Sequence, residues 1–334
     1  MYLETFTAPK DPAAARDNED RLVVYGGRTF AVIDGVTDKR GVRYAGRTGG
    51  WHAGQALEGA LRAMTDEDTL AHADAGEVID RLNGAIRGAY VRFGELEPAA
   101  ADPGRRFGAA IAVAHLDGEV LRLLLVGDCG ARVGDRLWHR AHPADDLLAA
   151  LRAEAFAFLG EALPGQPIDD RLDLARAYTV AGVANPLPDG PLSSADQRSL
   201  AALVGARLRA EFASLDDRLR DALAEGGLRA AARLRAQGST LGHGVLDGFP
   251  VDPGDVDDVR LPWDEVEALE LFSDGYFGWP TPGGTVSAWE AHADLVERED
   301  PHRIGRFRST KGSRPGQRAD DRSVLILRKD PPIP

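Results

Sequence analysis

Two apolar runs joined by a tight turn make up residues 107–128, FGAAIAVAHLDGEVLRLLLVGD. Asp117-Gly118 separates the runs, and an Asp-Gly pair between apolar segments is a strong short-range signal of a β-hairpin. Because a hairpin joins antiparallel strands, this stretch predicts an antiparallel sheet. Asp128 then closes the second run.

Other short apolar runs bounded by Gly, Pro or Asp predict further strands. Residues 22–25 and 29–33 flank Gly26-Gly27-Arg28, where we expect a second hairpin. The remaining strands are expected at residues 131–138, 241–246, 269–272 and 323–327.

Helices are expected at residues 51–64, 75–94 and 285–298. The second of these places its large apolar residues on one face at helical spacing, namely Ile79, Leu82, Ile86, Tyr90 and Phe93. Strands and helices that alternate in groups, without a regular β-α-β rhythm, indicate antiparallel sheets covered by helices. The predicted fold class is therefore α+β, an antiparallel β-sandwich flanked by helices.

The segment 141–238 has a different, helical character. Apolar residues recur at helical spacing in two stripes, one of Leu147, Leu151, Ala155 and Phe158, the other of Val204, Leu208, Phe212, Leu215, Leu219 and Leu223. The second stripe breaks near Ser214, and a loop rich in Pro and Gly at residues 186–194 separates the two. We interpret the segment as a helical insertion or an enlarged flap within a single domain, 1–334. It serves either as a lid or partner surface, or only as additional core.

Composition excludes several classes of protein. A formal net charge of −13 argues against a protein that binds nucleic acid by neutralising phosphates. The single cysteine excludes an internal disulfide, and there is no Cys/His zinc pattern. Residues 1–10 lack the apolar core of a secretory signal, and no run of 18 apolar residues is present. We therefore expect a cytoplasmic protein without a membrane span.

Four aspartates stand at the edges of predicted strands. Asp34, Asp128 and Asp274 follow their strands, and Asp320 precedes the last one. In an antiparallel sheet these positions can fall at the same end, where closely spaced carboxylates repel one another unless a cation is bound. Oxygen ligands favour a hard divalent ion, so the pattern indicates a metal site. The alternative for any one of them is an aspartate that only forms a turn.

Five short motifs occur in a characteristic order. They are Arg16 with Asn18-Glu19-Asp20, Asp34-Gly35, Gly127-Asp128, Ser273-Asp274-Gly275, and Asp320-Asp321-Arg322-Ser323. In this order and beside these strands, the chain resembles the metal-dependent PP2C (PPM) Ser/Thr phosphatases of bacteria. The resemblance covers residues 16–140 and 238–328. It implies an α-β-β-α sandwich and hydrolysis of phosphomonoesters by a metal-bridging water.

The resemblance also implies roles for individual residues. Asp34 would bridge two Mn²⁺ or Mg²⁺ ions, and the Gly35 carbonyl would bind one of them. Asp274 and Asp320 would hold the first ion, and Glu19 the second. Asp128 with Asp274 would form a third, weaker metal position. Asp34, Asp274 and Arg16 are thus the predicted catalytic residues.

Arg16 is the candidate phosphate clamp, because a guanidinium can bind two phosphoryl oxygens at once. It precedes Glu19 by three residues, whereas the family spacing is four. A solvated surface arginine is the alternative.

Two further positions depart from the family or stand beside the motifs. Val36 occupies the place where relatives often carry a histidine that protonates the leaving group, so a metal-bound water or His52 would replace it. The alternative for His52 is a surface histidine near a helix start. Cys129 is expected to be a small buried turn residue, because the neighbouring Asp128 opposes thiolate formation.

The loop 36–50 is locally basic. It carries Lys39, Arg40, Arg43 and Arg47 against one acid, Asp38. On an acidic protein this patch could receive an anionic substrate, and the alternative is a solvated loop without that role.

Phosphoserine or phosphothreonine in proteins is the expected substrate. Two alternatives stay open, a phosphatase of the same fold acting on a small phosphorylated metabolite, and a pseudophosphatase that only binds. No nucleic-acid or membrane partner is expected, and the sequence gives no indication of the oligomeric state.

Overall fold

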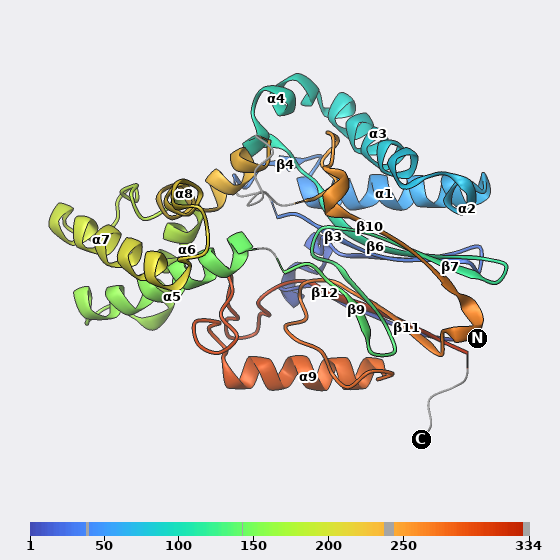
Figure 1. Ribbon diagram of the computed structural model, residues 1–334. Helices are drawn as coiled ribbons and strands as arrows, with labels where there is room; N and C mark the ends of the chain where they lie inside the picture. Colours follow the sequence, from blue (N-terminus) through green and yellow to red (C-terminus); the bar gives the residue numbers. More distant parts are fainter. Residues whose placement is uncertain (38–39, 142, 237–243, 330–334) are drawn as a thin grey trace. The chain divides into compact units, whose positions relative to one another are not determined.

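The computed structural model describes residues 1–37, 40–141, 143–236 and 244–329. The chain divides into two compact units (Figure 1). The first contains residues 1–140, 244–295 and 320–334, and the second contains 141–243 and 296–319. The second unit thus includes the predicted insertion together with a later segment. Within the described residues, no helix is both long and apolar enough to cross a bilayer.

The first unit holds two antiparallel five-stranded sheets. One sheet has the order β10-β7-β6-β3-β2. Its strands are β2 (Arg21–Tyr25), β3 (Thr29–Gly35), β6 (Ala109–Asp117), β7 (Val120–Val126) and β10 (Val256–Pro262). The hairpin predicted from residues 107–128 is confirmed as β6 and β7, with Asp117 opposite Val120.

The other sheet has the order β1-β12-β11-β8-β9. Its strands are β1 (Tyr2–Ala8), β8 (Gly130–Val133), β9 (Arg136–Trp138), β11 (Ala268–Phe272) and β12 (Arg322–Arg328). A small separate hairpin consists of β4 (Arg43–Tyr44) and β5 (Arg47–Thr48).

Alternation of side chains along the strands builds the layers. Phe30 and Val32 of β3 face the other sheet, where they join a buried cluster with Leu271 and Leu325. Ala31 and Ile33 face the opposite way, under helices α1 (Gly49–Asp66) and α3 (Ala75–Phe93).

A further helix, α9 (Val286–Glu299), covers the outer face of the other sheet (Figure 1). Its Trp289 belongs to a buried cluster with Phe272 and Ile326 of that sheet. The predicted helix–sheet–sheet–helix architecture is therefore confirmed. Two short helices, α2 (Thr69–His72) and α4 (Leu96–Ala101), flank α3 in sequence.

Several sequence predictions need correction. Residues 131–138 form a hairpin instead of one strand, because Gly134 takes a positive φ of 56° between β8 and β9. The edge strands β1 and β10 were not predicted. Of the strand expected at 241–246, residues 241–243 lie outside the described part, and Leu246 makes only an isolated bridge with Ala109.

The second unit is helical. It contains α5 (Pro143–Ala162), α6 (Ile168–Ala181), α7 (Ser194–Glu211) and α8 (Asp217–Ala236). The predicted stripes lie in its core, where Leu147, Leu151, Val204, Leu208 and Leu223 are buried. The break expected near Ser214 is confirmed, since α7 ends at Glu211 and α8 begins at Asp217.

One buried arginine fixes the later segment of this unit. Arg152 of α5 is 3% exposed, and its Nη1 donates to the carbonyls of His302 (2.9 Å) and Arg303 (3.0 Å). The same nitrogen also reaches Ser309 O and Lys311 O at 3.2 and 3.3 Å. These charge-assisted bonds supply partners to backbone carbonyls that no helix or strand satisfies.

Candidate functional site

The topology of the first unit brings several strand ends to one end of the sandwich. β3 and β7 both run antiparallel to β6, so Asp34 and Asp128 lie at the same end of their sheet. β2 is antiparallel to β3, so its start, with Asp20, lies there too. In the other sheet, the end of β11 meets the starts of β8 and β12 and the end of β1.

The carboxylates at this end interact directly. Asp34 of β3 and Asp274, which follows β11 in the other sheet, lie near enough for their charges to interact, and Asp20 and Asp128 add negative potential at Asp34. Burial, followed by these charges, holds the pKa of Asp34 well above its usual range. The structure thus brings together three of the four strand-edge aspartates predicted from sequence.

Asp20 links the cluster to the second sheet. It is 5% exposed, and its Oδ2 accepts a 2.8 Å hydrogen bond from the Ser273 hydroxyl. The Ser273 oxygen accepts in turn from the Ser323 amide at 2.9 Å. Burial and the charge of Asp321 raise the pKa of Asp20 well above its usual range. The serine of Ser273-Asp274-Gly275 is therefore a tether between the ends of the sheets.

Asp321 fixes the backbone of two other segments. It is 3% exposed and accepts hydrogen bonds from the amides of Glu19 (3.0 Å) and Lys10 (2.6 Å). Asp320, its neighbour, accepts from the Asp321 amide at 3.1 Å and contributes negative potential at Asp321. Asp320 precedes β12, whose start lies at this end of its sheet beside the end of β11.

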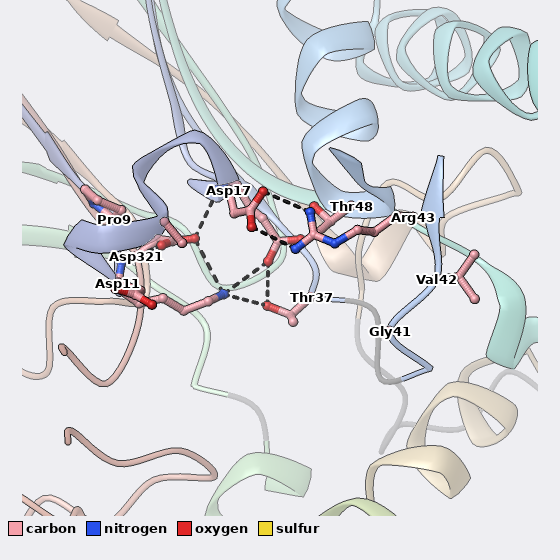
Figure 2. A pocket seen from close by; sticks show the side chains of 12 residues that line it. Pro9, Asp11, Asp17, Thr37, Gly41, Val42, Arg43, Thr48 and Asp321 are labelled. Carbon is pink, nitrogen blue, oxygen red and sulfur yellow. Dashed lines mark hydrogen bonds and ion pairs between the residues drawn. The ribbon is translucent and has the colours of Figure 1, made fainter. Parts of the chain in front are cut away.

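Glu19 and Lys10 line a pocket of about 310 Å³ beside the cluster (Figure 2). Glu19 Oε2 accepts from Thr37 Oγ1 at 2.7 Å and from Lys10 Nζ at 3.3 Å. The charged residues of the lining are Lys10, Asp11, Asp17, Glu19, Arg43 and Asp321, four acids against two bases. Sequence reasoning missed Lys10, because a single lysine near the chain start carries no pattern.

Gly35 is at a point of close backbone approach. A Cβ atom on Gly35 would lie 2.7 Å from the Gly50 carbonyl and 2.9 Å from the Glu19 carbonyl oxygen. A Cβ on Gly50 would lie 2.7 Å from Glu19 Oε1. Only glycine lets the end of β3, the start of α1 and the Glu19 segment meet this closely.

The predicted phosphate clamp, Arg16, lies apart from the pocket lining. Its side chain is 76% exposed, and its nearest acid is Asp17 at 4.0 Å. Arg43 lines the pocket instead and donates to both carboxylate oxygens of Asp17, at 2.9 and 2.7 Å (Figure 2). Neither Arg43 nor Asp17 is fully buried, and the pair forms one wall of the pocket.

The predicted basic loop is structured where it is described. Arg47 donates to the Arg16 carbonyl and lies over the ring of Trp51, and Arg40 reaches Tyr44 Oη at 3.3 Å. Lys39 lies outside the described residues. The described arginines are thus engaged within the protein, and the β4–β5 hairpin gives the loop a fixed shape.

His52 and Cys129 are both buried. His52 is 6% exposed, its Nε2 hydrogen-bonds the Tyr44 carbonyl at 2.7 Å, and burial lowers its pKa. It is therefore not a surface histidine, and its described contacts do not include the aspartates. Cys129 is fully buried, and burial raises the pKa of its thiol, in agreement with the predicted role as a turn residue.

The chemistry of this end suits a divalent cation. Glu19 Oε1 and Asp20 Oδ1 are buried and lack hydrogen-bond partners within the described part of the chain, which is costly for carboxylate oxygens. Among the described residues, no three acids, histidines or cysteines already converge as a ligand shell. The suitability of these residues for a divalent cation therefore rests on their carboxylate oxygens, and above all on the two that have no hydrogen-bond partner among the described residues.

Comparisons with known proteins give a likeness of fold. No family model and no curated protein matches the chain. A bacterial serine phosphatase structure is 13% identical, with 100% of this chain and 99% of that chain covered and a TM-score of 0.47. Stp1 from Staphylococcus aureus, a serine/threonine phosphatase, is 13% identical over 99% and 96% of the two chains, with a TM-score of 0.45.

The catalytic domain of the serine/threonine phosphatase PstP, in complex with two manganese ions, is also 13% identical. The match covers 97% of this chain and 96% of the PstP chain, with a TM-score of 0.42. All three are serine or serine/threonine phosphatases. At such identities and TM-scores we draw no conclusion about activity from the likeness.

Proposed function

We propose that this chain is a divalent-cation-dependent phosphatase that hydrolyses phosphomonoesters. The observation that carries the proposal is the meeting of Asp34 and Asp274 from opposite sheets, with Asp20 and Asp128 beside them. A cation bound among these acids would neutralise their charge, and carboxylate oxygens are the ligands that hard divalent ions prefer.

We assign Asp34, Asp128, Asp274 and Asp320, with Glu19 and the Gly35 carbonyl, as the groups that would hold Mn²⁺ or Mg²⁺. When bound, such ions activate a water molecule and neutralise charge on the phosphoryl oxygens. The resemblance of the motifs makes phosphoserine or phosphothreonine in proteins the expected substrate. The catalytic role of Arg16 stays a prediction, since its side chain is exposed and outside the pocket lining.

The chain's own residues have supporting roles in this proposal. The Ser273 hydroxyl donates to Asp20 Oδ2 and so fixes the orientation of the Asp20 carboxylate at the ends of the sheets. Asp321 ties the Glu19 amide to the start of β12 and so fixes the distance between segments that are far apart in sequence. The adjoining pocket is lined by Lys10 and Arg43 together with four acids, so a bound cation would add the positive charge that an anionic group needs there.

The experiment is hydrolysis of p-nitrophenyl phosphate with Mn²⁺, with and without EDTA, by the full chain and by Asp274→Asn. We expect hydrolysis that EDTA abolishes and a loss of at least about 100-fold in the variant, the scale of losing one electrostatic stabiliser of the transition state. Asp135→Asn, the same change at an exposed turn, is the matched control. Hydrolysis that is insensitive to EDTA, or unchanged in Asp274→Asn, would contradict the proposal.

Substrate class is tested separately. Faster hydrolysis of a phosphothreonine peptide than of a sugar phosphate is expected. The reverse order would assign the chain to small phosphorylated metabolites instead.

A further inference from the structure

Lys10 is held in place at both ends of its residue. Its backbone amide donates to Asp321 Oδ1 at 2.6 Å, directly after β1 pairs with β12. Its side chain is 32% exposed, and it returns so that Nζ lies 3.7 Å from Asp321 Oδ2. The backbone amide and the side chain of Lys10 thus both approach the buried carboxylate of Asp321, and its ammonium also approaches a second carboxylate.

That second carboxylate is Glu19, which is 1% exposed. Lys10 Nζ lies 3.3 Å from Glu19 Oε2 and 3.3 Å from Thr37 Oγ1, and Thr37 donates to the same carboxylate oxygen. Among the described residues, Lys10 is the cation found within ion-pairing distance of Glu19. A carboxylate this buried is costly without a positive charge beside it, and Lys10 supplies that charge.

Glu19 retains one oxygen that the protein does not satisfy. Glu19 Oε1 is buried beside the Cα of Gly50, and none of the residues that the structure describes donates a hydrogen bond to it. The carboxylate thus has one oxygen held by Thr37 and Lys10 and one oxygen free of protein donors. A second cation would find a ligand there.

We propose that the Lys10 ammonium is an internal cation that competes with a divalent ion for Glu19. This inference rests on the proposed function, because it concerns the metal position to which Glu19 is assigned there. An ammonium and a divalent ion next to the same carboxylate repel each other, so binding of the ion requires Lys10 to withdraw. The four-carbon stem of lysine and its pocket-lining position permit that movement.

The consequence is a metal position weakened by the protein itself. The ammonium held at Glu19 Oε2 repels a divalent ion that approaches Oε1, so occupancy there depends on the concentration of the ion. A displaced ammonium would stay in the pocket, where an anionic group of the substrate would attract it. Lys10 would then be a positioning residue that couples metal occupancy to substrate binding.

The test is calorimetric titration of the full chain with Mn²⁺ alone, comparing Lys10→Met with the unaltered protein. Methionine keeps the apolar length of the side chain and removes its charge. We expect Lys10→Met to bind Mn²⁺ about tenfold more tightly, or to bind an additional ion, because one neighbouring positive charge is gone. Lys10→Arg, which keeps the charge, is expected to bind as the unaltered protein does.

Lys329→Met is the matched control for net charge. Lys329 Nζ donates to the Asp264 carbonyl at 2.7 Å and lies over Trp263, and neither partner belongs to the acidic cluster. Tighter binding in Lys10→Met but not in Lys329→Met supports the proposal. Equal or weaker binding in a folded Lys10→Met, with folding checked by circular dichroism, would overturn it.

The two proposals fail in different ways. If Lys10 does not compete with the ion, Mn²⁺ affinity is unchanged while EDTA-sensitive hydrolysis persists. If the chain is not a cation-dependent phosphatase, hydrolysis is absent or insensitive to EDTA, whatever the Mn²⁺ affinity of Lys10→Met.

Discussion

The first unit contains two kinds of buried carboxylate, and they are treated in opposite ways. Glu270 is 1% exposed and accepts from Arg132 Nε at 2.6 Å, while Arg132 Nη1 also donates to the Pro280 carbonyl at 2.6 Å. At the end of the sandwich, Asp34 instead contacts Asp274, and the neighbouring charges of Asp20 and Asp128 are negative as well. The charge of Glu270 is neutralised by a neighbouring arginine, whereas Asp34 lies among other acids whose negative charges disfavour its ionised form.

This difference separates a structural ion pair from a candidate binding site. The fold can neutralise a buried acid, as Arg132 and Glu270 show on adjacent strands β8 and β11. Grouping like charges lowers the stability of the folded state, and such costs are typical of functional sites. Changes at the two places should therefore have opposite effects on stability.

The largest expected effect on stability is at the neutralised carboxylate. Glu270→Gln leaves the Arg132 guanidinium buried without its counter-charge, so we expect the free energy of unfolding to fall by about 3–5 kcal/mol. Urea denaturation measures it. Glu265→Gln is the matched control, because that acid lies 3.7 Å from Arg136 in a pair in which both side chains are more than half exposed. Equal losses in the two variants would contradict the distinction drawn here.

A third kind of buried ionisable group is a histidine with one hydrogen bond, at Nδ1, and none at Nε2 within the described residues. His115 of β6 is 1% exposed and shares a 2.8 Å hydrogen bond with Thr29 Oγ1, and its pKa is lowered to about 4. Burial is the largest cause, and the charged groups around it are Arg28, Asp117, Arg122 and Asp68.

This histidine predicts a pH dependence of stability. The unfolded chain takes up a proton near pH 6.5 and the folded chain only near pH 4, so the unfolded state binds more protons between these values. Stability should fall as the pH is lowered through this window, by up to about 3 kcal/mol. Urea titrations of the unaltered protein and His115→Gln from pH 7 to pH 4 isolate the effect. A slope that is the same in both would contradict it.

The smallest expected effect has the opposite sign. Asp34→Asn removes one negative charge from the cluster, so in EDTA we expect the free energy of unfolding to rise by about 1–2 kcal/mol. Added Mn²⁺ should stabilise the unaltered protein more than the variant, since a ligand of the folded state raises its stability by mass action. Thermal unfolding with EDTA and with Mn²⁺ measures both. An Asp34→Asn variant that is less stable in EDTA would show that the cluster is not repulsive.

Much of the fold could be predicted because its signals are local. The turn of the 107–128 hairpin and the helical periodicity of α3 and of the second unit are encoded within short windows. The edge strands β1 and β10 were missed because polar residues interrupt the apolar ones irregularly, as in VDDVRLP, and no long apolar run marks them. Their positions depend on pairing with distant strands.

The site could be predicted only in part, for the same reason. Asp34, Asp128 and Asp274 each end an apolar strand, which marks them in the sequence, and the structure brings them together. Lys10 reaches Asp321, 311 positions away, only because β1 pairs with β12. Arg16 follows a family motif, but its one-residue offset and exposed side chain place it outside the pocket lining.

The most direct test is to locate manganese in crystals of the full chain grown with Mn²⁺, by anomalous diffraction. The account predicts an anomalous peak bounded by the carboxylates of Asp34 and Asp274, and loss of that peak in Asp274→Asn. Peaks confined to other parts of the surface, or an Asp34–Asp274 contact unchanged at saturating Mn²⁺, would contradict it.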